Sequence, residues 1–355
     1  MKKLTKFDVG PIYLISYVLQ LVLQTVVLTA FQARYGDAYK DHYSWTYAIV
    51  FVNGLSFLAA ALGYSAAKKI KFFSEVGIKK KPDAKMSLLI VPIAVFTIFS
   101  TMPLANWFVE LFGKLGYDVA ASSITMPTDV FGYILMSLFL SLVPAVCEEI
   151  MFRGAIAVGL RRQGAAVAVL LSAAMFSLMH GNPVQLVHQF GIGVVLAVVV
   201  LTSGDIKYAM AFHFLNNFIS CIASLIFPSL NSIEFAAWQI PVGLAVMAVG
   251  LAALTVAVTA FVRRSLEVNA GEKAEGGFKN LVKSVAVGFV GIFKKGGLRK
   301  VFDNINDVMR KVTPDIDSDG VDDEAYLYGK KCPPLLVLSL VLLVVMWILN
   351  TAMGF

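Results

Sequence analysis

The chain carries a series of apolar segments, most of them long enough to cross a lipid bilayer as a helix. A spanning helix needs about 20 mainly apolar residues, and its backbone groups must be hydrogen-bonded within the segment because the bilayer core offers no water. The 58% hydrophobic content and the mean hydropathy of +0.76 are typical of a polytopic membrane protein. We identify nine candidate spans, at 11–31, 45–67, 86–108, 130–160, 165–180, 184–202, 208–227, 238–262 and 334–353.

The distribution of cations predicts the orientation of these spans. Three lysines precede the first span and seven lie between residues 68 and 85, whereas the next loops on the other side hold Arg34, Lys40 and Lys114. Cytoplasmic loops carry the excess of lysine and arginine. We therefore expect an integral membrane protein with a cytoplasmic N-terminus, and our expectation for its location is the plasma membrane of a bacterium. Attraction to anionic membrane lipids then explains the net charge of +7, and nucleic-acid binding is not required.

The predicted fold class is all-α, a polytopic transmembrane helix bundle of about eight or nine spans with amphipathic cytoplasmic helices. A change in composition after residue 264 separates a polar, basic segment from the spans before it. We expect five regions: scaffold helices at 1–129, a helix core with intramembrane polar residues at 130–227, an additional helix at 228–264, a cytoplasmic segment at 265–333 and a C-terminal helix at 334–355.

The cytoplasmic segment contains two features of its own. Apolar residues recur at helical spacing through 278–312, which predicts two amphipathic helices that lie on the inner leaflet, cover the cytoplasmic face of the bundle or bind a protein partner. The run 315–323 has the D-x-D-x-D-G opening of a calcium loop, but Tyr326 replaces the final bidentate glutamate. We expect an acidic, solvated loop there, with calcium binding as the weaker alternative.

Two adjacent carboxylates and an arginine interrupt the apolar run 131–160. Charged groups at bilayer depth are costly and need partners. On an α-helix Glu149 and Arg153 are separated by four residues, so they can pair. Glu148 lies about 100° further around the axis and needs another partner.

Later segments supply candidate partners. His180 follows Phe176 by four residues, and Asn217 follows His213 by the same interval, so each pair shares a helix face. If 130–160 and 165–180 form a hairpin about Gly164, Glu148 and His180 lie at similar depth. His213 and Asn217 are then offset by about one to two turns.

In their order along the chain, Glu148-Glu149-x-x-x-Arg153, Phe176-x-x-x-His180 and His213-x-x-x-Asn217 resemble the motifs of the CPBP family. That family comprises CAAX prenyl endopeptidases and bacteriocin-processing or self-immunity (Abi-like) proteins. The resemblance covers about 130–227 and implies an intramembrane endopeptidase that hydrolyses a membrane-associated peptide, prenylated or leader-bearing. The cytoplasmic insert and the ninth span depart from the usual eight-helix plan.

The resemblance assigns the catalytic positions to Glu148, His180, His213 and Asn217, with support from Glu149, Arg153 and Phe176. We expect Glu148 to be the general base for a water shared with His180, and His213 and Asn217 to stabilise the oxyanion. Arg153 would orient Glu149, and Phe176 would fix the rotamer of His180. If a divalent metal such as zinc is bound, its ligands are Glu148, His180 and His213. We favour a metal-independent water because no H-E-x-x-H pair is present.

Three other readings of the same residues remain open. Buried polar side chains can join membrane helices without catalysis. Carboxylates and histidines inside a membrane also form ion or proton relays in transporters. Finally, a protein can keep the family motifs and act as a membrane scaffold or regulator.

Overall fold

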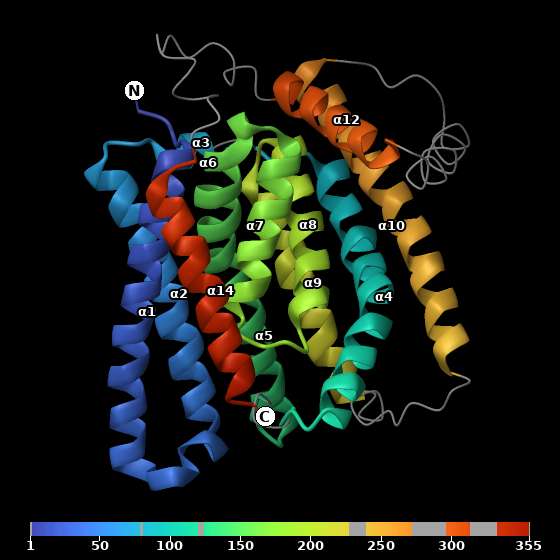
Figure 1. The fold of residues 1–355 in the computed structure, drawn as a ribbon. Helices are drawn as coiled ribbons and strands as arrows, with labels where there is room; N and C mark the ends of the chain where they lie inside the picture. Colours follow the sequence, from blue (N-terminus) through green and yellow to red (C-terminus); the bar gives the residue numbers. More distant parts are fainter. Residues whose placement is uncertain are drawn as a thin grey trace.

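The computed structural model describes residues 2–78, 81–119, 124–226, 239–271, 296–312 and 332–354, and these form a bundle of helices without a β-sheet (Figure 1). Eight helical stretches in these ranges are long and apolar enough to span a membrane, and α7 is a shorter apolar helix of 15 residues. The prediction of an all-α polytopic bundle is confirmed.

The elements are α1 (Lys6–Tyr35), η1 (Gly36–Asp41), α2 (Tyr43–Ala67), α3 (Phe72–Glu75), α4 (Ala84–Lys114), α5 (Val130–Glu148), η3 (Glu149–Ala157), α6 (Val158–Leu160), η4 (Arg161–Gln163), α7 (Ala165–Met179), α8 (Leu186–Ser203), α9 (Ile206–Ile226), α10 (Gln239–Ala270), α12 (Gly297–Val312) and α14 (Pro334–Ala352).

The central helices carry the predicted site residues and the others surround them. α5 packs against α9 and α7 packs against α8. The α1–α2 pair lies on one side and the α4–α10 pair on the other, while α14 packs on α1 and α7 (Figure 1). The two chain ends lie at opposite ends of the bundle (Figure 1).

The outer helices expose large apolar side chains along their length. Val22 on α1, Val249 on α10 and Val341 on α14 are each more than half exposed. Apolar surface on this scale is unusual for a soluble monomer but suits helices that face lipid tails.

The segment after α5 departs from a simple α-helix. The chain is α-helical to Glu148, and the next nine residues, Glu149–Ala157, form the π-helix η3. Gly164, at φ 94°, then turns the chain into α7, so the predicted hairpin about this residue is present. π-helical segments are rare and often occur at functional sites, which directs attention to the two glutamates at the junction.

The turn between α8 and α9 packs against the residues that follow α3. Ile206 N–H donates to Val76 O at 3.0 Å, and a Cβ on Gly77 would lie 1.9 Å from Gly204 O. Gly77 also has φ 73°, so this close backbone approach requires glycine.

Helix α10 ends later than the sequence suggested. The predicted span stops at residue 262, but the helix continues to Ala270. Arg264 in this extension pairs with Asp83 at 2.8 Å and with Glu267 at 2.9 Å. The hydrogen bond from Arg264 and that from the Met86 backbone N–H lower the pKa of the Asp83 carboxyl to about 2. The Arg264–Asp83 pair joins α10 to the N-cap of α4.

Only part of the predicted cytoplasmic segment is described. α12 is the second amphipathic helix, and it packs across the ends of α7, α8 and α10 (Figure 1). It therefore covers one end of the bundle, which was one of the three expected placements. The first amphipathic helix, predicted within 278–296, and the calcium-like run 315–323 lie outside the described residues.

Substitution of Gly193 tests the close packing of α7 and α8. A Cβ on Gly193 would lie 3.0 Å from both the Cα and the Cβ of Ala173, so we expect Gly193→Ala to separate the helices and destabilise the bundle by about 1–3 kcal/mol. Gly63 has no atom within 4 Å of such a Cβ, so Gly63→Ala should be neutral or slightly stabilising. Thermal unfolding in detergent, followed by circular dichroism, compares the two variants. Equal melting temperatures would contradict the packing argument.

Candidate active site

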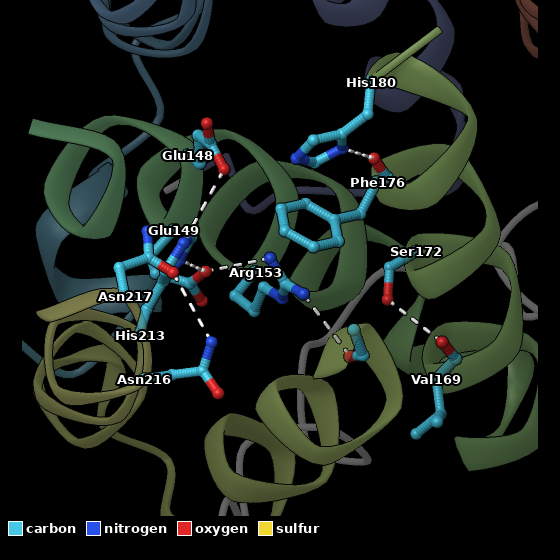
Figure 2. Close-up of polar contacts among 11 residues, drawn as sticks. Glu148, Glu149, Arg153, Val169, Ser172, Phe176, His180, His213, Asn216 and Asn217 are labelled. Carbon is cyan, nitrogen blue, oxygen red and sulfur yellow. Dashed lines mark hydrogen bonds and ion pairs between the residues drawn. The ribbon is translucent and has the colours of Figure 1, made fainter. Parts of the chain in front are cut away.

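A fully buried ion pair occupies the centre of the site. Arg153 Nη1 lies 2.8 Å from Glu149 Oε1, and both side chains are 0% exposed (Figure 2). Arg153 also donates from Nη2 to Gly193 O at 3.4 Å, and its guanidinium carbon lies 4.2 Å from the centroid of the Phe176 ring. The pair predicted between positions four residues apart is therefore present, even though the local helix is a π-helix. Contacts of this kind help to offset the cost of removing both charges of a buried ion pair from water.

Glu149 also holds His213, which the sequence analysis did not predict. The Nδ1 atom of His213 lies 2.8 Å from Glu149 Oε1. A carboxylate can only accept, so this nitrogen carries the hydrogen and the Nε2 edge of the ring turns toward Glu148, whose Oε2 lies 3.8 Å away (Figure 2). The sequence contained one signal for this contact: a buried carboxylate with a single arginine partner can still accept further hydrogen bonds.

His180 is oriented by its own helix. It is the residue after α7, and its Nδ1 lies 2.8 Å from Phe176 O. A carbonyl oxygen only accepts, so Nδ1 carries the hydrogen, and the neutral ring leaves Nε2 as an acceptor. Figure 2 shows this second nitrogen on the side of the ring that faces Glu148.

Phe176 packs between the charged pair and both histidines. Its ring centroid lies 4.9 Å from that of His180 and 5.9 Å from that of His213, both in edge-on geometry. Its face meets the Arg153 guanidinium. The expected contact between Phe176 and His180 is thus part of a larger aromatic contact that also separates His180 from Arg153 (Figure 2).

The two adjacent glutamates have different environments. Glu148 ends α5, and its side chain is 19% exposed, whereas Glu149 begins η3 and is 0% exposed. Glu149 is occupied by Arg153 and His213. Glu148 is the carboxylate that a water or a peptide can reach.

Asn217 forms a hydrogen bond that links α9 to α5. Its Nδ2 donates to Leu140 O at 3.4 Å. That carbonyl lacks its usual helical partner because the residue four positions later is Pro144, which has no N–H. Neighbouring helices commonly satisfy such carbonyls in membrane proteins. Asn217 is therefore anchored through one amide hydrogen and keeps the second.

Asn216 is a site neighbour that the sequence analysis missed. It is buried and donates from Nδ2 to Asn217 Oδ1 at 3.4 Å. Its own Oδ1 is buried and has no hydrogen-bond partner. The sequence did contain a signal for Asn216: two adjacent asparagines follow His213 within a membrane segment, and both side-chain amides need hydrogen-bond partners there.

The residues expected to bind a metal do not form a closed ligand set. In the described part of the chain, no group of three histidine, cysteine, aspartate or glutamate side chains is arranged to hold an ion. Glu149, the deepest carboxylate, is engaged by Arg153 and His213. Glu149 is therefore not available as a further metal ligand.

The arrangement fits proton transfer to and from a water. Glu148 supplies a carboxylate, and the Nε2 atoms of His180 and His213 face the same side (Figure 2). General acid–base chemistry needs such groups within hydrogen-bond reach of one water or substrate atom.

Comparison with known proteins identifies the central helices. A family model described as type II CAAX prenyl endopeptidase Rce1-like matches residues 130–219. The match begins at α5, ends within α9 and includes every predicted site residue. The predicted membership in the CPBP group of intramembrane proteases is confirmed for this region. No curated protein and no solved structure is significantly similar to the chain.

Removal of Arg153 tests the buried pair. We expect Arg153→Ala to destabilise the protein by about 3–5 kcal/mol, because it leaves Glu149 charged and buried. Arg299 on α12 is a matched control, since its side chain is 88% exposed and lies 4.0 Å from Asp303. Arg299→Ala should change stability by less than about 0.5 kcal/mol. The pair would not have the assigned role if both variants unfolded at the same temperature.

Proposed function

We propose that this membrane protein is an intramembrane endopeptidase acting on a membrane-associated peptide, because residues 130–219 match a family model described as type II CAAX prenyl endopeptidase Rce1-like. The observation that carries the proposal is the orientation of the site. Buried partners fix His180 and His213 so that the second nitrogen of each ring faces Glu148, the one reachable carboxylate of the pair. A network that only joined helices would not need a reachable carboxylate.

The mechanism begins with a water between Glu148 and His180. Nε2 of His180 accepts a hydrogen bond from the water and orients its oxygen toward the scissile carbonyl. Glu148 takes the proton as the oxygen attacks the carbonyl carbon, and it later gives that proton to the nitrogen of the leaving peptide. The carbon–nitrogen bond breaks, and the elements of one water are divided between the products: the acyl product has gained the hydroxyl group and the amine product the hydrogen.

The developing oxyanion needs donors that are already in place. Asn217 keeps one amide hydrogen for this purpose, because its other one is held by Leu140 O. His213 is the second group that we assign to the oxyanion, because its Nε2 edge lies on the Glu148 side of the site, 3.8 Å from Glu148 Oε2.

Substitution of Glu148 and His180 tests the enzyme assignment. We expect Glu148→Ala and His180→Ala each to reduce cleavage by about 10²-fold or more, with nearly unchanged melting temperature. The assay uses an internally quenched peptide with a prenylated CAAX terminus, and the unprenylated peptide is its matched control. Glu110→Ala, which removes a half-exposed pair with Lys114, should cleave like wild type.

A second measurement finds substrates without assuming prenylation. The membrane peptidome of cells with wild-type protein is compared with that of cells carrying Glu148→Ala. We expect a set of peptides that changes only between these two strains. If no peptide changes and the variant keeps the biological phenotype, the protein is a scaffold or regulator.

Chelation tests the metal-independent mechanism. We expect purified protein to keep its cleavage rate after exhaustive treatment with a zinc chelator, because Glu148 and His180 are assigned the activation of water. Stoichiometric bound zinc, together with loss of cleavage on its removal and recovery on its return, would show this mechanism to be wrong.

A further inference from the structure

The helix that carries His180 begins without a capping side chain of its own. Its N-cap is Gly164, and Ala165, the first residue of α7, is 0% exposed. A buried backbone N–H at a helix start requires a partner. The partner is Asn306 on α12, whose Oδ1 accepts from Ala165 N–H at 2.5 Å. Asn306 thus acts as an N-cap from a segment 141 residues away.

Helix α12 is held firmly enough to supply this contact. Met309 and Val312 are 3% and 4% exposed, and Phe302 packs against the main core. α12 also contacts α7, α8 and α10. It lies beyond residues 130–219, so this contact comes from outside the family domain.

The axial position of α7 depends on contacts near its ends. The helix is apolar on most sides, and the hydroxyl of Ser172, near its middle, bonds to carbonyls of the same helix. At the other end, Ser177 donates its hydroxyl hydrogen to Leu186 O. These directional hydrogen bonds at both ends add to the close packing of α7 on α8 in fixing the helix along its axis.

A small shift of α7 would displace His180 from Glu148. One residue of helix corresponds to about 1.5 Å of rise, and about 1 Å of misplacement at a reacting group can cost about 10²-fold in rate. Hence the cap at Ala165 and the position of His180, at opposite ends of one short helix, are mechanically linked.

We propose that Asn306 is a positioning residue that fixes α7 along its axis and so sets His180 opposite Glu148. This inference rests on the proposed peptidase function. It assigns to α12 a role in catalysis from outside the family domain, and Asn306 itself does not touch the substrate.

Three variants of α12 test the proposal. Asn306→Ala removes the acceptor oxygen. Asn306→Asp keeps an acceptor, and its charge suits a helix N-terminus. Asn304→Ala is the control on the same helix, because Asn304 is exposed. Each full-length variant is measured for kcat and KM with the quenched prenylated CAAX peptide, and for the ring ¹⁵N shifts of His180.

We expect Asn306→Ala to lower kcat by about tenfold or more with little change in KM, and to move the His180 signals. Asn306→Asp should restore both readouts, and Asn304→Ala should match wild type. A kcat for Asn306→Ala equal to that of Asn304→Ala would overturn the proposal, as would failure of Asn306→Asp to restore it. If wild type shows no Glu148-dependent cleavage, the peptidase function is wrong. Unmoved His180 signals in Asn306→Ala would overturn the positioning role independently.

Discussion

The arrangement of the central helices depends on the buried contact between Glu149 and Arg153. Removing two charges from water is costly, and their mutual attraction offsets that cost only when further hydrogen bonds satisfy both groups. Here His213 contributes from α9, Gly193 from α8 and Phe176 from α7. Four elements, η3, α7, α8 and α9, therefore meet at one ion pair, and a shift of any of them would remove a contact from a buried charge.

The same contact separates the tasks of two neighbouring glutamates. Glu149 has no exposed surface and orients Arg153 and His213, whereas Glu148 stays partly exposed and free for chemistry. The change from α5 to the π-helix η3 falls between these two residues. Identical side chains in adjacent positions thus receive opposite environments, which is the usual way in which proteins assign different roles to paired carboxylates.

Local spacing was enough to predict part of this site. The Glu149–Arg153 pair and the hairpin about Gly164 follow from intervals of four residues and from helix rise. The contacts between distant segments could not be predicted in this way: His213 with Glu149, Asn217 with Leu140 O and Asn306 with Ala165. The π-helix was also missed, because apolar residues all around a buried segment fit α and π geometry equally. The continuation of α10 to Ala270, beyond the span predicted at 238–262, could not be predicted either, because the Arg264–Asp83 pair that it carries joins distant segments.

The hydrogen positions on the two histidines test the account most directly. The sequence has four histidines, so ¹⁵N-histidine labelling gives few ring signals, and single substitution of His42 and His188 assigns the remainder. Glu149 and Phe176 O can only accept, so Nδ1 of both His213 and His180 must carry a hydrogen. We expect protonated Nδ1 signals from both rings in wild-type protein. A bare Nδ1 in either ring would contradict the account, because a nitrogen without a hydrogen cannot donate to Glu149 or to Phe176 O.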